Sequence, residues 1–498
     1  MRAGRDERPA LPPFAILPVL ALALAKLALD LPFAHRYGWH RDEVYYLASG
    51  NHLQLGYVDY PPLTPLLSRL EEQIVGTSLT GQRAAPALTG AVLVILAALI
   101  ARELGGGRLA QVLAALLSLA SPMFLGANLL MQTVSFDELW WAVALYLAAR
   151  LQRTGNARLW LLLGLTFGIA LETKYTVLTL IFGLGVATLV ARRRDLATPW
   201  PWIGALIALA ILAPNLAWQL QKGWPSLSYI RAHQTNIAQS QSLLDLIGGG
   251  LVLLGPGVAV TSFGGAYILL RERSWRFLGW ILLVTAAVLL LSGSKNYYYG
   301  PLFTLLYAAG AVRVERLRLA APARAWLLRA TLIGVAADTL FLPVALPVLP
   351  QQQMVQLQIW KARDDYAGMF GWPELTDQVA AIYRGLPAQE RARTTIFGSS
   401  YSAAGAIDLY GPARGLPHAV SQHLTYWYWK PPHAGGGTVI AIDFPHSFVD
   451  REFRGCRDAG IIGAPYGVRM EQTSGHIWVC QDPEDNLDHH WRTYQSFA

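Results

Sequence analysis

Long apolar runs separated by short polar segments make up the first 350 residues of the chain. A helix of roughly 17 to 25 apolar residues matches the hydrocarbon core of a bilayer. This pattern predicts about eleven membrane-spanning helices, some of them short. Their predicted ranges are 12–33, 86–100, 109–125, 139–149, 159–171, 176–191, 202–220, 243–270, 277–291, 301–312 and 326–349.

Beyond residue 350 the pattern becomes that of a water-soluble domain, in which helical runs alternate with short strand-like runs between Gly and Pro turns. Strand-like runs occur at 394–397, 438–444 and 476–480. The sequence therefore predicts two domains. Residues 1–350 form a polytopic α-helical membrane domain with a long outer loop at 35–83, and residues 351–498 form a soluble α/β domain.

Composition agrees with a membrane protein. Hydrophobic residues are 53% of the chain and charged residues 14%, against about 25% charged in an ordinary soluble domain. The net charge of +8 would suggest nucleic acid binding in a soluble chain, but here the arginines stand in clusters between apolar runs. That distribution is typical of membrane topology, so the predicted partner is a lipid bilayer and not nucleic acid.

The arginine clusters also predict the orientation. With the N-terminus in the cytoplasm, every cluster falls in an inside loop, as the positive-inside rule requires. The clusters lie at 102–108, 150–158, 192–194, 271–276 and 313–329. An odd number of spans then places the C-terminal domain outside, and the first helix is an uncleaved anchor. We expect a multi-pass protein of a bacterial inner membrane with a periplasmic C-terminal domain.

The outer loops carry the acidic residues. Asp42 and Glu43 lie in the 35–83 loop, and a second pair, Asp137 and Glu138, begins a later span on the same side. Acids at a helix start are commonly caps that interact with the helix dipole. Two such pairs on one face argue against capping alone and indicate a reaction site.

Basic and aromatic residues accompany the acids. Lys174, Lys295 and Arg83 lie at outer helix boundaries, where a lone cation commonly snorkels to the interface. Several cations that face several acids suit an anionic headgroup, above all phosphate. The tyrosines beside the acids either belong to an interfacial belt or stack on a sugar or lipid: Tyr45, Tyr46 and Tyr57.

Two features of the C-terminal domain leave alternatives open. The aromatic segment at 424–432, LTYWYWKPP, is either a core strand or an acceptor-binding surface. Cys456 and Cys480 are the only cysteines of the chain. In an oxidising periplasm a disulfide between them is favoured over two buried thiols.

Several motifs together resemble the GT-C membrane glycosyltransferases, in the branch that includes protein O-mannosyltransferases, the lipid A aminoarabinose transferase and the rhizobial lipopolysaccharide galacturonosyltransferases. The resemblance covers the membrane domain. Its motifs are HRDEVYYLASG at 40–50, GYVDYPPL at 56–63, R-x-x-PAL-x-G at 83–90, SFDEL at 135–139, TKY at 173–175, PN-x-x-W-x-x-x-x-GWP at 214–225 and SKNYYYGPL at 294–302.

This resemblance implies a GT-C fold and an inverting transfer of a sugar from a polyprenyl-phosphate donor to an envelope acceptor, which is a lipid, a glycan or a protein. Asp42 would be the base that activates the acceptor, with Glu43 completing the family's acidic pair. Lys174, Lys295 and Arg83 would hold the donor phosphate. The remaining loop residues would bind substrate: Asp137, Glu138, Tyr45, Tyr46 and Tyr57.

A metal ion is implied less directly. The aminoarabinose transferases carry a metal-binding acid before two prolines, and the similar residue here is Asp59, although Tyr60 replaces the family's lysine. His233 is a second ligand by position. Asp and His suit zinc or magnesium, but two ligands leave the choice between a metal site and none open.

Two rival functions remain. A flippase or transporter of a lipid-linked saccharide would show broken helices or internal repeats with charges near mid-span. The ionisable residues here instead gather at the outer ends of the spans. A non-catalytic subunit on the same scaffold would be indicated if Asp42 were dispensable.

Overall fold

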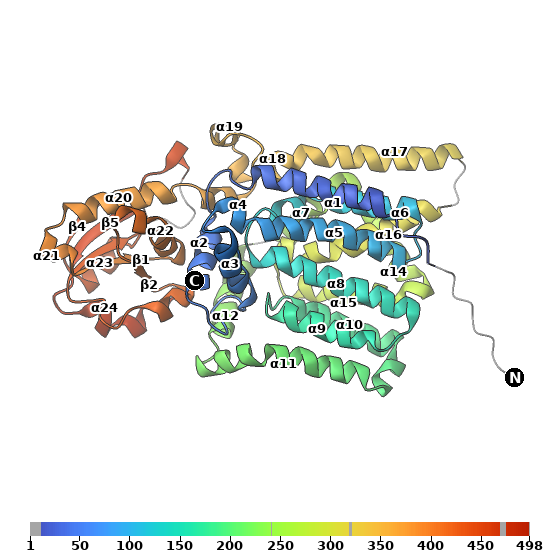
Figure 1. Cartoon of the computed structure of the whole chain (residues 1–498), viewed down its shortest axis with the longest axis horizontal. Coiled ribbons are helices and arrows are strands. Elements are labelled where there is room, and N and C mark those ends of the chain that lie inside the picture. The colour runs from blue at the N-terminus through green and yellow to red at the C-terminus, as the bar shows by residue number, and fades with distance from the viewer. Residues whose placement is uncertain (1–10, 241, 318–320, 469–474, 498) are drawn as a thin grey trace.

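Helices built from the long apolar runs lie side by side and form the larger part of the molecule (Figure 1). The structure is a computed structural model that describes residues 11–240, 242–317, 321–468 and 475–497. The helices of this bundle are α1 (Ile16–Asp30), α5 (Ala84–Glu103), α6 (Arg108–Ala120), α7 (Pro122–Ala127), α8 (Thr133–Thr154), α9 (Leu159–Leu171), α10 (Val177–Ala191), α11 (Trp200–Gln221), α13 (Leu243–Leu254), α14 (Ala259–Arg271), α15 (Arg276–Leu291), α16 (Phe303–Arg316), α17 (Ala321–Asp338) and α18 (Leu342–Ala345).

Within the described residues, five helices are long and apolar enough to cross a membrane, or six if a bent pair is one span. Shorter apolar helices, α6, α9 and α10, lie among them. The predicted apolar ranges lie mostly in helices, whereas the total of about eleven spans stays a prediction. The range 109–125 is interrupted at Ser121, and the range 326–349 is broken after Asp338 and ends outside a helix.

The run at 243–270 is not the single helix predicted from its apolar content. It is broken between α13 and α14, whose axes differ by 83°. Gly255 at the break has a φ of +97°, and a Cβ on Gly257 would lie 2.2 Å from the carbonyl oxygen of Gly334 in α17. The carboxylate of Asp338 accepts a hydrogen bond from the backbone N–H of Gly257 at 2.8 Å. Close packing and this cap together stabilise a break that hydrophobicity alone conceals.

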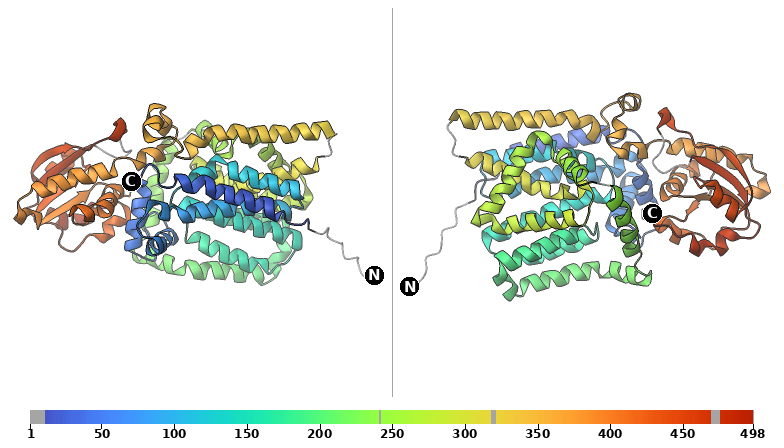
Figure 2. Two further views of the ribbon diagram at one scale, coloured as in Figure 1. Left: turned by 45° about the horizontal axis from the view of Figure 1, so that its top comes forward. Right: turned by 180° about the vertical axis from the view of Figure 1, so that it is seen from behind.

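The arginine clusters meet at one end of the bundle. Arg153 pairs with Glu103 at 2.5 Å, and Arg316 donates a hydrogen bond to the backbone oxygen of Leu104 at 2.7 Å. The opposite end carries the short helices of the predicted outer loops, which lie between the bundle and the C-terminal domain (Figures 1 and 2). They are α2 (Arg41–Asn51), α3 (Leu63–Val75), α4 (Leu79–Gln82) and α12 (Pro225–Ser240). Which side of the membrane each end faces stays a prediction.

The C-terminal domain contains a five-stranded sheet in the order β2-β1-β3-β5-β4. β1 pairs in parallel with β2 and β3, while β5 is antiparallel to β3 and β4. The strands are β1 (Thr394–Gly398), β2 (Ala419–Ser421), β3 (Thr438–Ile442), β4 (Arg454–Ile461) and β5 (His476–Gln481). The helices after the bundle are α19 (Gln351–Gln356), α20 (Trp372–Gly385), α21 (Ala388–Arg391), α22 (Tyr401–Tyr410), α23 (His446–Glu452) and α24 (Asn486–His489). The predicted strand-like runs correspond to β1, β3 and β5.

Alternating side chains give the sheet two buried faces. Ile440 and Ile442 of β3 pack with α20 and α22, whereas Val439 and Ala441 pack with α23 and α24. Successive residues of a strand point to opposite faces, so continuous apolar strands of this kind require cover on both sides. The face that carries Ile440 also contacts the tyrosines of the 35–83 loop, which joins the two domains into one core.

The aromatic segment at 424–432 is not a strand. Its residues Leu424–Trp429 form a 3-10 helix, η10, between β2 and β3. The ring of Trp429 stacks on His52 with the centroids 4.5 Å apart, and Thr425 Oγ1 accepts a hydrogen bond from the N–H of Val58 at 3.0 Å. The segment therefore docks the C-terminal domain on the 35–83 loop.

Cys456 and Cys480 form a disulfide that links the exposed edge strand β4 to β5. We predict that replacing both cysteines by serine lowers the stability of the domain. The bond joins residues 24 positions apart, and a loop of this size contributes about 3 kcal/mol by limiting the unfolded chain. Thermal unfolding of the purified protein in detergent should show a lower melting temperature for the double variant and for the reduced wild type. Equal melting temperatures for all three samples would contradict this role.

Candidate functional site

The 35–83 loop forms a folded platform at the end of the bundle, and its first α-helix is α2. His40 caps this helix: its Nδ1 accepts a hydrogen bond from the N–H of Asp42 at 3.2 Å. In return, Glu43 Oε2 accepts one from the N–H of His40 at 2.8 Å, which completes a capping box. The capping interpretation therefore applies to Glu43 and not to the carboxylate of Asp42.

Glu43 and Arg83 form a buried ion pair. Both carboxylate oxygens of Glu43 accept hydrogen bonds from Arg83, at 2.8 and 2.7 Å, and both side chains are at most 1% exposed. The remaining N–H groups of Arg83 donate to the backbone oxygens of Ala34, Arg36 and Gly38. A guanidinium has five N–H donors, so all of them are occupied. Arg83 is thus placed to hold the loop together and not to bind a donor phosphate.

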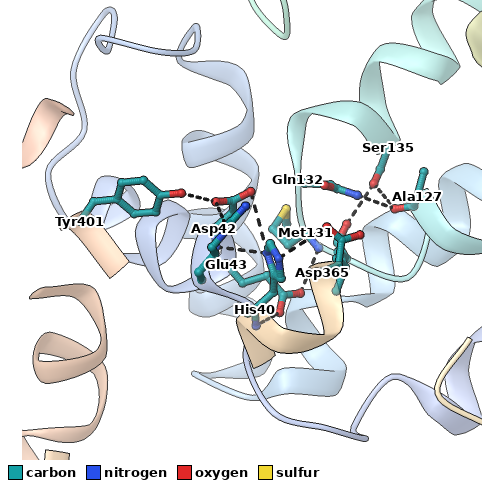
Figure 3. Close-up of polar contacts among 12 residues, drawn as sticks. His40, Asp42, Glu43, Ala127, Met131, Gln132, Ser135, Asp365 and Tyr401 are labelled. Atoms are coloured by element: carbon teal, nitrogen blue, oxygen red, sulfur yellow. Dashed lines mark hydrogen bonds and ion pairs between the residues drawn. The ribbon is translucent and has the colours of Figure 1, made fainter. Parts of the chain in front are cut away.

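The carboxylate of Glu43 also bonds to the bundle. Glu43 Oε1 accepts a hydrogen bond from the N–H of Met131, in the link between α7 and α8, at 3.1 Å (Figure 3). One side chain therefore fixes the platform to the bundle at two places, the start of α5 and the start of α8.

We predict that Glu43→Gln destabilises the protein. The change keeps the shape of the side chain but leaves the buried Arg83 charge uncompensated, which costs about 3–5 kcal/mol. The matched control is Glu72→Gln, which breaks the partly exposed pair of Arg69 and Glu72 and should cost at most about 1 kcal/mol. Melting temperatures of the purified variants in detergent provide the comparison, and equal losses in the two variants would contradict the assigned role of Glu43.

Asp42 faces away from this ion pair. Its side chain is 32% exposed, and its Oδ1 accepts a hydrogen bond from the hydroxyl of Tyr401 in α22 at 2.6 Å. Within the described residues no hydrogen bond reaches Oδ2, and His40 Nδ1 lies 3.9 Å from it. The adjacent acids thus have different environments, one enclosed and paired, the other accessible.

The second acidic pair lies on the first turns of α8. Asp137 accepts hydrogen bonds from Trp141 Nε1 at 2.9 Å and from Thr176 Oγ1 at 2.8 Å. Glu138 is fully buried and accepts one from Asn128 Nδ2 at 3.3 Å. Its Oε1 is buried without a hydrogen-bond partner in the described part of the chain.

The two predicted lysines meet these acids. Burial lowers the pKa of Lys174, in the turn between α9 and α10, to about 8; Asp137 opposes this shift and Lys295 adds to it. Asp42 and Glu138 also act on the Lys174 charge. The ammonium group lies 5.0 and 4.7 Å from the ring centroids of Tyr297 and Tyr298. The structure therefore brings together five predicted site residues: Asp42, Asp137, Glu138, Lys174 and Lys295.

The predicted substrate-binding tyrosines are more enclosed than an open subsite would require. Tyr57 is fully buried, and its hydroxyl donates to the backbone oxygen of Ser49 at 3.0 Å, which closes the loop on itself. The hydroxyl of Tyr45 donates to Asp59 at 3.0 Å. Tyr46 is 6% exposed and lies within the electrostatic range of Asp42 and Asp59. Of the three tyrosines, Tyr46 is the one that interacts with the charge of Asp42, the predicted base.

Asp59 is a buried acid whose charge interacts with that of Asp42. Burial raises the pKa of Asp59 to about 8, with a further contribution from Asp42, while the hydrogen bond from Tyr45 opposes the shift. Within the described residues no group of three or more His, Cys, Asp or Glu side chains could hold a metal ion. The side chain of the predicted partner His233 lies outside the described residues. A zinc or magnesium ion at Asp59 stays a prediction, and no step below depends on it.

Two sets of residues near the site escaped the sequence analysis. Tyr401 comes from the C-terminal domain, more than 300 positions after Asp42, and no local pattern links the two. Lys26 and Asp30 form a buried ion pair in α1, and the Lys26 charge acts on Glu138. A Lys and an Asp four positions apart inside an apolar run were a readable signal, because an ionisable residue within a span is costly unless paired.

Part of the chain is similar in sequence to known proteins. A model of the dolichyl-phosphate-mannose-protein mannosyltransferase family matches residues 59–218. The lipid A galacturonosyltransferase RgtD of Rhizobium johnstonii is 24% identical over 220 residues, which are 43% of this chain and 46% of that protein. The match thus spans about half the length of this curated relative.

Solved structures show a likeness over most of the chain. ArnT from Cupriavidus metallidurans bound to undecaprenyl phosphate aligns with a TM-score of 0.57 at 15% identity, over 93% of this chain and 97% of that one. The archaeal oligosaccharyltransferase AglB from Archaeoglobus fulgidus, in complex with an inhibitory peptide and a dolichol-phosphate, aligns with a TM-score of 0.51 at 13% identity, over 86% and 69%. The predicted resemblance to GT-C glycosyltransferases is confirmed, and the chain has their fold: a helical bundle followed by a small sheet domain.

Proposed function

We propose that this GT-C chain is an inverting glycosyltransferase that moves a sugar from a polyprenyl-phosphate donor to an envelope acceptor, at the outer face of a bacterial inner membrane. One observation carries the proposal. An accessible carboxylate, Asp42, faces a cluster that pairs the cations Lys174 and Lys295 with the acids Asp137 and Glu138. Base and phosphate-binding cations are the two groups that such a transfer needs on opposite sides of one sugar.

Asp42 supplies the base. Its carboxylate takes the proton from an acceptor hydroxyl as that oxygen attacks the anomeric carbon from the face opposite the phosphate. The new C–O bond forms as the bond between the sugar and the phosphate oxygen breaks, and the configuration at carbon is inverted. The proton remains on Asp42, and the polyprenyl phosphate leaves with the bonding electrons.

The lysines stabilise the leaving group. The phosphate departs as an anion and requires positive charge around it, not a proton donor. Lys174 meets this need because the rings of Tyr297 and Tyr298 hold its ammonium in place. Asp137 and Glu138 then face the sugar side of the cluster as substrate-binding residues. Similarity to an enzyme bound to undecaprenyl phosphate and to a lipid A galacturonosyltransferase supports a lipid-linked donor.

The acceptor class is left open among lipid, glycan and protein. The relatives differ on this point, since one is named for lipid A and another is in complex with a peptide. The C-terminal domain lies against the Asp42 side of the platform and would be the part that meets the acceptor.

Transport of a lipid-linked saccharide is the rival function, and one observation favours it. The break between α13 and α14 is a feature that transporters share. However, the polar groups at this break are satisfied by Asp338 and by close packing with Gly334. A moving element would need two arrangements of these contacts.

The decisive prediction concerns Asp42. Cells with wild-type protein, with a deletion, and with Asp42→Asn at equal expression should be compared by mass spectrometry of envelope lipids, glycans and proteins. We expect one sugar-sized mass increment to disappear in both mutants while the sugar-charged polyprenyl phosphate persists, because Asn cannot accept the proton. The lost increment identifies the sugar and the acceptor together.

Other outcomes separate the rivals. A deletion phenotype with normal glycosylation in Asp42→Asn would overturn the base assignment and favour transport or a scaffold role. Accumulation of the lipid-linked sugar on the inner side alone would favour transport.

A second prediction concerns the donor phosphate. Lys174→Gln should weaken binding of undecaprenyl phosphate to the purified protein by roughly 10- to 100-fold, the effect of one hydrogen bond to a charged group. Because the pKa of Lys174 is about 8, wild-type affinity should also fall between pH 7 and pH 9, and the affinity of the variant should depend less on pH. Lys222→Gln is the control, since Lys222 lies over Tyr428 on the same side of the bundle. Equal affinities for wild type and Lys174→Gln would contradict the assignment.

A further inference from the structure

Tyr401 reaches Asp42 from the C-terminal domain. It is the first residue of α22, a helix capped by Ser400, whose Oγ accepts a hydrogen bond from the N–H of Ala403 at 3.2 Å. The hydroxyl of Tyr401 donates to Asp42 Oδ1 at 2.6 Å, and Figure 3 shows the ring pointing at the carboxylate. Burial and the negative charge of Asp42 hold the pKa of Tyr401 well above its ordinary value. The hydroxyl is therefore a permanent proton donor in this contact.

The ring that carries this hydroxyl is enclosed on both sides. Tyr45 stacks on it with centroids 4.4 Å apart and planes 21° apart, and His423 lies 5.1 Å away at 26°. Burial lowers the pKa of His423 to about 4, so this neighbour is uncharged at neutral pH. A tyrosine held between two rings presents its hydroxyl in one direction.

The helices behind the ring are also in close contact. A Cβ on Gly405 of α22 would lie 3.2 Å from the Val44 backbone oxygen in α2. Glycine at this position lets α22 approach α2, the helix that carries Asp42. The hydrogen bond thus joins two elements whose spacing is fixed by packing.

We propose that Tyr401 is a positioning residue for transfer: it holds Oδ1 of Asp42 and leaves Oδ2 directed at the hydroxyl of the acceptor. This inference rests on the proposed function. A carboxylate held at one oxygen loses rotational freedom about its terminal bond, so the other oxygen is ready for the proton. The C-terminal domain then belongs to the reaction centre itself and is more than a surface for the acceptor.

Other groups also face Asp42. On its own element and its cap are His40 and Arg41, each 3.9 Å from a carboxylate oxygen. Across the site, charge interactions connect Asp42 with Asp59, Lys174, Tyr46, Tyr229 and Tyr297. Removing the Tyr401 hydroxyl leaves every one of these side chains in place, although the hydroxyl also interacts electrostatically with Arg41 and Asp59.

The test uses Tyr401→Phe, which keeps the stacked ring and removes only the hydroxyl. The control is Tyr426→Phe: Tyr426 lies in the same aromatic cluster, 6.0 Å from Tyr45, but its hydroxyl donates to Asp408. Each purified full-length variant is added to membranes of the deletion strain, which supply their own donor and acceptor. Initial rates of the sugar increment are measured by mass spectrometry against membrane concentration, which separates the maximal rate from the concentration at half-maximal rate.

We expect Tyr401→Phe to lower the maximal rate by roughly 10- to 100-fold, the range of one hydrogen bond to a charged group. The membrane concentration at half-maximal rate should stay unchanged, because the hydroxyl does not contact the phosphate cations. Tyr426→Phe should change neither quantity.

Two results would overturn the positioning role: an unchanged maximal rate in Tyr401→Phe, or the same loss in both Phe variants. The second comparison excludes a general effect of removing a hydroxyl from the aromatic cluster, because Tyr426→Phe removes one from the same cluster without touching Asp42. If wild-type protein itself adds no sugar to these membranes, the transfer activity fails and the positioning role with it. If wild type is active and Tyr401→Phe is normal, only the positioning role fails.

Discussion

The buried pair of Glu43 and Arg83 is the interaction on which the rest of the site depends. It closes the 35–83 loop through three backbone oxygens and anchors that loop to the start of α8 through Met131. A charge buried at the end of an apolar bundle is tolerable only when it is fully paired. The pair therefore imposes one arrangement on the platform, and α2 can project Asp42 from a rigid base.

The adjacent acids divide two tasks that a single side chain could not combine. A base must be accessible and able to accept a proton, whereas a structural carboxylate must be enclosed and fully bonded. Successive residues at a helix start point about 100° apart, so Asp42 faces the site while Glu43 faces the core. The second pair differs, because both of its acids are buried: Asp137 accepts two hydrogen bonds, and Glu138 Oε1 has no partner in the described chain.

The C-terminal domain completes the site because one face of its sheet packs on the platform. Tyr45 of the platform makes two contacts with this domain: it stacks on Tyr401, and its hydroxyl accepts a hydrogen bond from the N–H of Thr425. An aromatic core shared in this way couples the orientation of the domain to Asp42, the proposed base. In the proposed function, the sheet domain thus affects the choice of acceptor separately from the cations proposed to hold the phosphate.

The sequence by itself determined the helical bundle, the presence of strands after it and the gathering of Asp42, Asp137, Lys174 and Lys295 at one end. Hydrophobic run length and charge placement are local properties, and the bilayer forces polar loops to its surfaces. Tertiary structure alone decided that Glu43 pairs with Arg83, that residues 243–270 break, and that Tyr401 bonds Asp42. Each of these depends on residues that are distant in the chain. Packing brings their side chains within hydrogen-bond distance, and neither periodicity nor composition shows which side chains will meet.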